Sequence, residues 1–141
     1  MAHWLYPANP KFYDVLEAFS APETYWTISS KVVLGDIVCI YLSAPYQQLG
    51  FVCEVTRVNI SKQEVIDVLR PFMKPHKSSA KSDKVFMKLR VCSRLNLEDN
   101  ILSYQALKEN GLNGMLMGPR KLENNPPLLN YIQKVLHATS L

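Results

Sequence analysis

Two strand-like segments joined by a short turn place the strongest limit on how this chain can fold. Residues 37–42 (IVCIYL) form an apolar run of strand length, and the Ser-Ala-Pro sequence that follows breaks it. The side chains of residues 50–59 alternate between two faces, as those of a second strand would. A parallel pair of consecutive strands needs a crossover of a dozen or more residues, so this short connection predicts antiparallel pairing. A doubly wound parallel sheet is therefore excluded.

The rest of the 141 residues adds short strands and short helices to this pair. Apolar, β-branched or alternating patterns predict strands at residues 4–6, 24–33, 84–93 and 114–117. Apolar spacing and capping residues predict helices at residues 10–19, 62–69, 103–110 and 126–136. Ser61 and Glu64 match a capping box at the start of the second helix. We expect one domain of the α+β class over residues 1–141, with a mixed, mostly antiparallel sheet or small barrel and peripheral helices.

Cysteine usage and hydropathy limit the class of protein. The three cysteines stand singly among apolar residues, without a CxxC motif, and so predict reduced thiols rather than a disulfide framework or a zinc site. No apolar stretch approaches the roughly 18 residues of a membrane span, and the first residues lack the pattern of a secretory signal. We therefore expect a cytoplasmic protein that does not associate with a membrane.

The positive charge of the chain is concentrated in one segment. The formal net charge is +4, yet residues 1–60 carry five acidic and three basic side chains. Residues 70–94 carry eight basic side chains against Asp83 alone, many of them in a Pro-, Ser- and Lys-rich stretch at about 71–83 that predicts a flexible, exposed loop. Such clustering is typical of a protein with a polyanion partner, and a solvated loop beside a strand with one polar face explains it equally well. The predicted phosphate-binding residues are Lys74, Lys77, Lys81, Lys84, Lys88 and Arg90.

Residue patterns that would point to catalysis or to a bound metal are scarce. None of the three His has a Cys or His neighbour at a metal-binding spacing, and no phosphate-binding glycine motif or nucleophile motif is present. We therefore expect no catalytic residue, no metal and no cofactor. Asp36 and Glu54, on neighbouring predicted strands, are the one carboxylate pair to consider. A turn role for Asp36 and a local hydrogen bond for Glu54 explain these two residues better.

Aromatic and polar side chains near strand ends are the candidates for a base-binding pocket. Aromatic rings stack on unpaired bases, and Asn, Ser or Gln side chains hydrogen-bond to base edges. Trp26, Tyr46 and Asn9 lie beside predicted turns, where a pocket can open. Ser43 and Gln47 supply further polar contacts in the turn after residues 37–42.

Taken together, residues 4–10, 35–43, 50–55 and 111–122 resemble segments of the EVE domain, a branch of the PUA-like superfamily. Residues 4–10 (WLYPANP) resemble its opening strand and loop, and residues 35–43 (GDIVCIYLS) resemble its Gly-Asp turn and apolar strand. Residues 50–55 (GFVCEV) resemble the strand that follows, and residues 111–122 (GLNGMLMGPRKL) resemble its closing segment ahead of a last helix. The four segments occur in the family's order over about residues 3–136.

This resemblance implies a PUA-like fold, a bent sheet or pseudo-barrel with helices around it. It also implies a pocket near the end of the first strand that accommodates a base, often a modified one, flipped out of nucleic acid. The YTH readers of methylated adenine are similar in architecture. Transferred by position, the implied pocket or rim residues are Asn9, Trp26, Ser43 and Arg120, and the basic loop at 71–83 looks like an insertion.

Three functions fit these observations. The first is a noncatalytic module that binds DNA or RNA through a base pocket and a basic backbone contact, with a separate protein as its effector. The second is a small enzyme, a nuclease or a base-modifying activity, that uses Asp36, Glu54 or His76. The third is a module for a small molecule or for another protein, with an incidental basic loop. The clustered charge and the pocket candidates favour the first.

Overall fold

The computed structural model describes residues 1–28, 31–74 and 85–139, and its centre is a six-stranded sheet. The strand order across the sheet is β2-β5-β4-β3-β1-β6. β1 pairs with β3 in parallel, and the other neighbouring strands pair antiparallel. The strand bounds are β1 (His3–Ala8), β2 (Glu23–Thr27), β3 (Ile37–Leu42), β4 (Gln48–Ser61), β5 (Val85–Arg94) and β6 (Arg120–Lys121).

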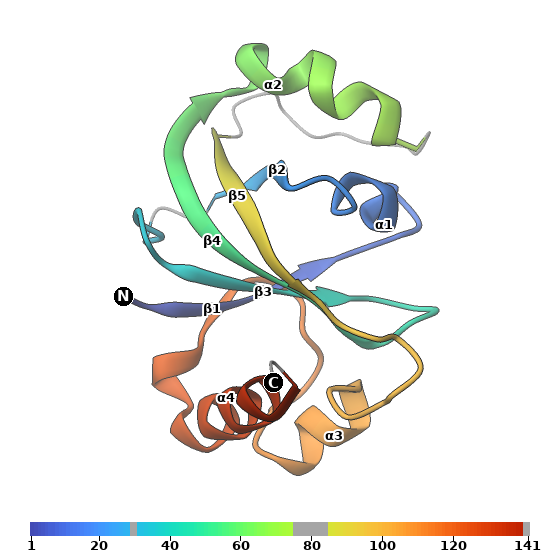
Figure 1. Cartoon of the computed structure of the whole chain (residues 1–141), viewed down its shortest axis with the longest axis vertical. Coiled ribbons are helices and arrows are strands. Elements are labelled where there is room, and N and C mark those ends of the chain that lie inside the picture. The colour runs from blue at the N-terminus through green and yellow to red at the C-terminus, as the bar shows by residue number, and fades with distance from the viewer. Residues whose placement is uncertain (29–30, 75–84, 140–141) are drawn as a thin grey trace.

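Helices cover both sides of this bent sheet. In Figure 1, α1 and α2 lie on one side, and α3 and α4 lie on the other. The helix bounds are α1 (Val15–Ala18), α2 (Lys62–Leu69), α3 (Tyr104–Glu109) and α4 (Pro126–Thr139), with short 3-10 turns at Arg70–Phe72 and Leu122–Asn124. The predicted α+β class with a mixed, mostly antiparallel sheet is confirmed, and β3 and β4 pair antiparallel as their short connection requires. In the described part of the chain, no helix combines the length and the apolar character needed to cross a membrane.

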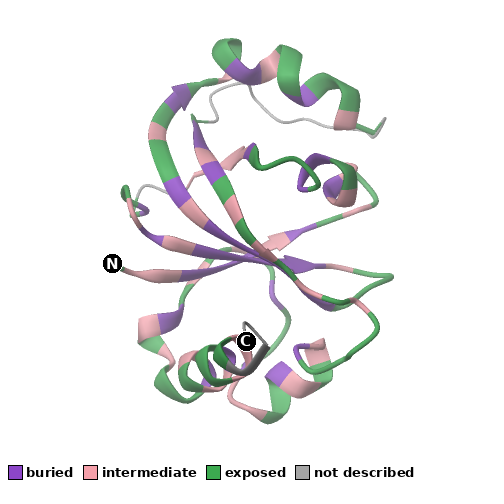
Figure 2. Cartoon of the chain, viewed as in Figure 1, coloured by how far each residue is buried: buried purple, intermediate pink, exposed green. Residues whose placement is uncertain are grey.

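The central strands are apolar on both faces because each face has its own core. In β1, Trp4 and Tyr6 pack in the cluster that contains α1, whereas Leu5 packs in the cluster that contains α3 and α4. In β3, Ile40 and Cys39 divide between the two clusters in the same way. Alternate side chains of a strand point to opposite faces, so a strand covered on both sides reads as a continuous apolar run. The buried middle of the sheet is visible in Figure 2.

The far ends of β4 and β5 leave this double core and form a third, smaller cluster under α2. Ile60 and Phe86 pack there with Val65 and Leu69. The β4–β5 register shifts between Arg57 and Ile60, which breaks strict alternation. The alternation at 84–93 assigns Phe86 to the same face as the basic side chains, but Phe86 is only 7% exposed, because it packs with Val65 and Leu69 of α2 at this end of the strand.

Local tertiary contacts override the expected helix at residues 10–19. The helix begins only at Val15, because Tyr13 forms an antiparallel bridge with Met73 and the Asp14 backbone N–H donates to the Phe72 carbonyl at 2.7 Å. The Asn9 side chain accepts a hydrogen bond from the backbone N–H two residues later, at 2.9 Å, and so closes a turn rather than capping a helix.

Two further local expectations are only partly met. Ser61 caps α2 by accepting from the Glu64 backbone N–H, but the Glu64 carboxylate pairs with Arg57 at 2.6 Å instead of folding back. Residues 114–117 form no strand, and the last strand lies instead at β6. A flexible loop was also predicted at about residues 71–83. From residue 75 onward, this segment lies outside the described residues.

Candidate nucleic-acid interface

The parallel pairing of β1 and β3 brings the residues after both strands to one edge of the sheet. Ala8 is in register with Leu42, so Asn9 and Ser43 leave the sheet side by side. The Ser43 backbone N–H donates to the Ala8 carbonyl at 3.0 Å and fixes this geometry. An open groove of about 740 Å³ lies here. Its lining residues are Pro7, Asn9, Phe12, Tyr41, Ser43, Ala44, Gln47, Tyr104, Met115, Leu116 and Met117.

Apolar side chains make up much of the lining of this groove. Phe12 is 40% exposed, and Met115 and Met117 are 71% and 82% exposed. Tyr41 also lines the groove and makes an edge-on contact with Tyr104, with ring centroids 6.5 Å apart. Burial, with a smaller contribution from Tyr104, raises the pKa of Tyr41 to about 12, so its hydroxyl stays protonated at neutral pH.

Uncharged hydrogen-bonding groups complete the groove. Among the described residues, none accepts a hydrogen bond from the Asn9 Nδ2 group, and none bonds to the Ser43 hydroxyl or the Gln47 carboxamide. The described lining residues include no charged side chain. An apolar slot with a few uncharged polar groups suits a planar, neutral ligand better than a phosphate.

Arg120 acts on this groove from outside it. Its guanidinium donates to the Asn113 and Met115 carbonyls, both at 2.6 Å, and the Tyr104 hydroxyl donates to the Gly114 carbonyl at 3.4 Å. These bonds hold the loop that carries Met115 and Met117. Arg120 itself lines a different surface depression, so the structure gives it a positioning contact rather than the expected place in the pocket.

We expect the Arg120→Gln variant to lower the free energy of unfolding by about 1–2 kcal/mol, because two charge-assisted hydrogen bonds are lost at a half-buried position. Amide exchange should quicken at residues 113–117. Urea denaturation and hydrogen exchange measure these two effects. The matched control is Lys121→Gln, which removes the neighbouring exposed charge. Equal stability and equal exchange in both variants would contradict the positioning contact.

Trp26 does not line the groove. It sits half-buried on β2, with its ring 5.2 Å from Tyr13 and 5.8 Å from Phe19 between centroids. β5, β4 and β3 separate its strand from β1. The expectation that Trp26 shares a cleft with Asn9 and Ser43 is therefore corrected. Tyr46 lies in the turn beside Ser43, to which its backbone N–H donates, but its side chain is not part of the groove.

The basic strand residues are engaged with carboxylates. On the outer face of β2, β5 and β4, Arg90 lies in register between Glu23 and Glu54 and binds Glu54 at 2.6 Å. Lys88 pairs with Glu23 at 3.4 Å. These pairs balance the charge that the sequence concentrates on β5, so neither side chain offers the unpaired cation expected of a phosphate-binding residue.

Of the remaining predicted phosphate contacts, only Lys74 lies in the described part. Its ammonium donates to the Pro10 carbonyl at 2.6 Å, and its backbone N–H donates to the Phe12 carbonyl at 3.0 Å. Lys74 therefore lies beside the groove, next to its lining residue Phe12. Lys77, Lys81, Lys84 and His76 lie outside the described residues.

The two carboxylates considered for catalysis do not form a pair. Asp36 is 1% exposed, and it accepts hydrogen bonds from Trp4 Nε1 and the Ala2 backbone N–H, both at 3.0 Å, and from the Val33 backbone N–H at 3.1 Å. Glu54 binds its own arginine on β5. Asp36 is thus a structural carboxylate that ties the start of β1 to the turn before β3. Among the described residues, no three His, Cys, Asp or Glu side chains gather as a metal site would require.

The groove contains residues that the sequence patterns assigned elsewhere. Phe12 fits the apolar face of a helix, and Met115 and Met117 fit a strand. The sequence does contain one indication of a loop at the methionines, because Gly114 and Gly118 lie on either side of them. Their place in the same groove as Asn9 depends on long-range packing that no local pattern contains.

Comparison with known proteins is informative only at the level of fold. No family model matches the sequence, and no curated protein matches it. Among solved structures, a hypothetical protein from Leishmania major is 16% identical, with a TM-score of 0.66 and coverage of 100% of this chain and 98% of that one. ASCH from Zymomonas mobilis is 11% identical, with a TM-score of 0.63 and coverage of 96% and 94%.

Human THYN1, solved in complex with DNA containing 5-methylcytosine, is 11% identical, with a TM-score of 0.50 and coverage of 77% of this chain and 74% of that one. The similarity to these solved structures lies in the fold, since the identities are low while the TM-scores are 0.63 and 0.50. The fold of the chain is therefore PUA-like.

Proposed function

We propose that this chain is a noncatalytic nucleic-acid-binding module that holds one unpaired or flipped base in the groove beside Asn9 and Ser43. The observation that carries the proposal is the groove itself, which is lined by uncharged hydrogen-bonding groups, aromatic rings and exposed methionines. The similarity in fold to THYN1, whose structure contains methylcytosine DNA, supports the same class of ligand.

The chemistry of the groove matches a base better than a phosphodiester. Phe12 presents an exposed ring for stacking, and carboxamides such as those of Asn9 and Gln47 match the donor and acceptor pattern of a base edge. The exposed methionines are polarizable and adapt to the opposite face of a ring. The backbone would then run outside the groove toward Lys74 and the basic segment that it begins.

The proposal includes three narrower statements. The segments at residues 4–10 and 35–43 support an EVE-type branch of the fold, and with it a modified base as the ligand. The three unpaired cysteines suit a reducing compartment such as the cytoplasm. The biological outcome would be delivered by a separate effector protein.

The Phe12→Ala variant tests the groove. Stacking on an aromatic side chain stabilises a bound base by about 1–3 kcal/mol, so binding should weaken about tenfold to a hundredfold. Affinity is measured by fluorescence anisotropy with single-stranded DNA, single-stranded RNA and duplexes with and without 5-methylcytosine. Binding of the parent protein should fall steeply with salt if phosphates are also engaged.

The control for this experiment is Val68→Ala, which truncates an exposed apolar side chain on α2, far from the groove. The control should bind like the parent protein. Parental affinity in both Phe12→Ala and Ser43→Ala would refute the groove as the binding site. Conversion of the nucleic acid to a product, with or without a divalent metal, would favour the enzyme alternative instead.

A further inference from the structure

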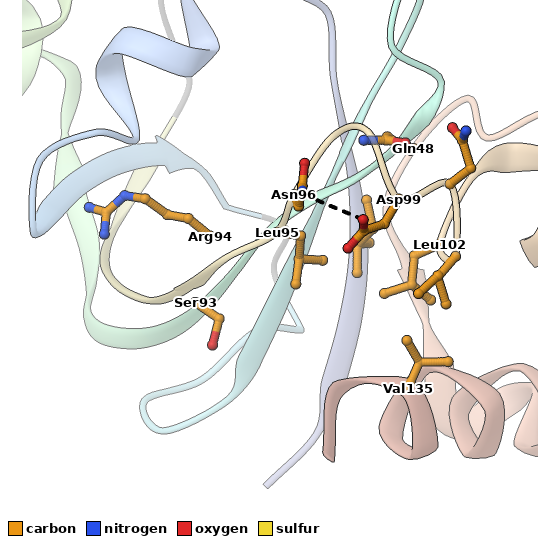
Figure 3. Close-up of a pocket in the computed structure, with 11 residues that line it drawn as sticks. Gln48, Ser93, Arg94, Leu95, Asn96, Asp99, Leu102 and Val135 are labelled. Atoms are coloured by element: carbon orange, nitrogen blue, oxygen red, sulfur yellow. Dashed lines mark hydrogen bonds between the residues drawn. The ribbon is translucent and has the colours of Figure 1, made fainter. Parts of the chain in front are cut away.

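A second cavity, of about 360 Å³, lies between the start of β4, the segment after β5 and α4 (Figure 3). It is separate from the groove. Gln47 lines the groove, whereas the next residue, Gln48, lines the cavity. Backbone contacts hold the chain between the two sites: the Tyr104 N–H donates to the Gln47 carbonyl at 2.7 Å, and Gln48 forms a β-bridge with Ser103. Its volume falls at the lower end of the roughly 300–1,000 Å³ range of small-molecule sites.

Gln48 is the unusual residue of this cavity. Its side chain is only 3% exposed, and among the described residues none hydrogen-bonds to its carboxamide. The hydroxyl of Tyr13 is the one fully buried side-chain nitrogen or oxygen of the described residues that lacks a partner, so the Gln48 carboxamide keeps some contact with solvent. Gln48 lines the cavity, and its carboxamide has a donor and an acceptor that no described residue occupies.

The other polar groups of the cavity are mostly uncharged. Asn100 adds a second carboxamide without a described partner, and Asn96 donates to the Asp99 carboxylate at 3.4 Å. The guanidinium of Arg94 extends away from the cavity in Figure 3, where it donates to the carbonyls of residues 19, 20 and 21. No described cation is thus available to an anion inside, and Asp99 would repel one.

Apolar side chains provide the remaining surface. Leu49, Leu95, Leu102 and Val135 come from β4, the segment after β5 and α4. An apolar surface beside carboxamides suits a flat ring that carries hydrogen-bonding groups along one edge. A carboxamide pairs with such an edge through one donor and one acceptor, as Asn and Gln do with adenine.

We propose that the Gln48 cavity is a second binding site, for a neutral nucleobase presented either as a free nucleoside or as the end of a nucleic-acid strand. This proposal does not depend on the groove. The base would lie against the leucines, with its polar edge on Gln48 and Asn100 and its sugar toward solvent. Phosphates would remain outside, because the cavity offers them no positive charge.

Nuclear magnetic resonance on the ¹⁵N-labelled full chain tests this site with two probes. Adenosine, guanosine, cytidine and uridine are titrated singly, and short single-stranded oligonucleotides are titrated in parallel. Shifts of the Gln48 side-chain amide and of the Leu49 and Leu102 backbone amides are expected with at least one nucleoside or with the oligonucleotides. A response to nucleosides identifies the free ligand as sufficient, and a response to oligonucleotides alone identifies a strand end.

Two variants then separate binding from folding. Gln48→Leu removes the carboxamide at nearly the same volume and should weaken the responding ligand by about tenfold or more. Asn100→Gly removes the second carboxamide at an exposed residue whose φ of +56° glycine adopts without strain, so it should weaken binding without unfolding the chain. The matched control Gln63→Leu, at an exposed position on α2, should bind normally.

Several results would overturn the proposal. One is the absence of any shift at Gln48 with either probe, and another is parental affinity in both Gln48→Leu and Asn100→Gly. Shifts confined to Asn9, Ser43 and their neighbours would also overturn it, while leaving the groove proposal intact. Conversely, loss of oligonucleotide binding in Phe12→Ala with an unchanged response at Gln48 would support both sites as separate.

Discussion

The Asp36→Ala variant should lose about 3 kcal/mol or more of the free energy of unfolding, because three N–H groups lose their only described acceptor. The indole N–H of Trp4, itself 4% exposed, would be left buried and unpaired, and the backbone N–H groups of Ala2 and Val33 would lose the same partner. Urea denaturation followed by tryptophan fluorescence measures the loss of free energy. In thermal unfolding, the same loss should lower the melting temperature by about 10 °C.

The Asp36→Asn variant keeps the shape of the side chain and isolates its charge. Burial by itself raises the pKa of Asp36, but the hydrogen bonds from Ala2, Val33 and Trp4 together outweigh it and hold the pKa below the ordinary value. The carboxylate therefore stabilises the fold above the ordinary Asp pKa, and this contribution disappears as the pH falls through the lowered folded-state pKa. The stability difference between the parent protein and Asp36→Asn should shrink over that acidic range. A constant difference would show that the charge plays no part.

The Trp26→Ala variant should act mainly on stability, with a loss of roughly 2–3 kcal/mol. The Trp26 ring packs edge-on against Tyr13 and Phe19, and removing it leaves a space beside α1. Thermal unfolding followed by circular dichroism measures the loss. Trp26→Phe, which keeps an aromatic ring in the same place, should recover most of it. If Trp26→Ala kept parental stability and instead lost nucleic-acid binding, the ring would belong to a ligand site after all.

The parts of the fold that follow from local spacing could be predicted from the sequence. The short connection after residue 42 correctly predicts that β3 and β4 are antiparallel, and Ser103 caps α3 as its position before the helix suggests. Asn9 and Ser43 could also be selected, because polar residues that follow two apolar strands often share an edge. Their adjacency, however, comes from the parallel pairing of β1 with β3, which no short-range pattern reveals.

The features that could not be predicted depend on which distant residues meet. The helical pattern at residues 10–19 was overridden by the bridge between Tyr13 and Met73, some sixty residues apart in the sequence. Trp26 could not be placed without knowing that β2 pairs with β5 at the opposite edge from β1. The sequence predicted that Lys88 and Arg90 are available to bind phosphate. Their acidic partners, Glu23 and Glu54, come from neighbouring strands, and the sequence of one strand does not show them.

Because β1 pairs with β3, the number of residues between Trp4 and Asn9 cannot change without disturbing the core. A deletion of one residue within β1 would turn Trp4 and Leu5 toward the opposite cores and move Asn9 away from Ser43 in the same step. Exchanges at positions 9 and 43, beyond the strand ends, leave that register untouched. The ligand preference of this scaffold can therefore change by substitution, whereas insertions or deletions that change strand length would remove the groove and the fold together.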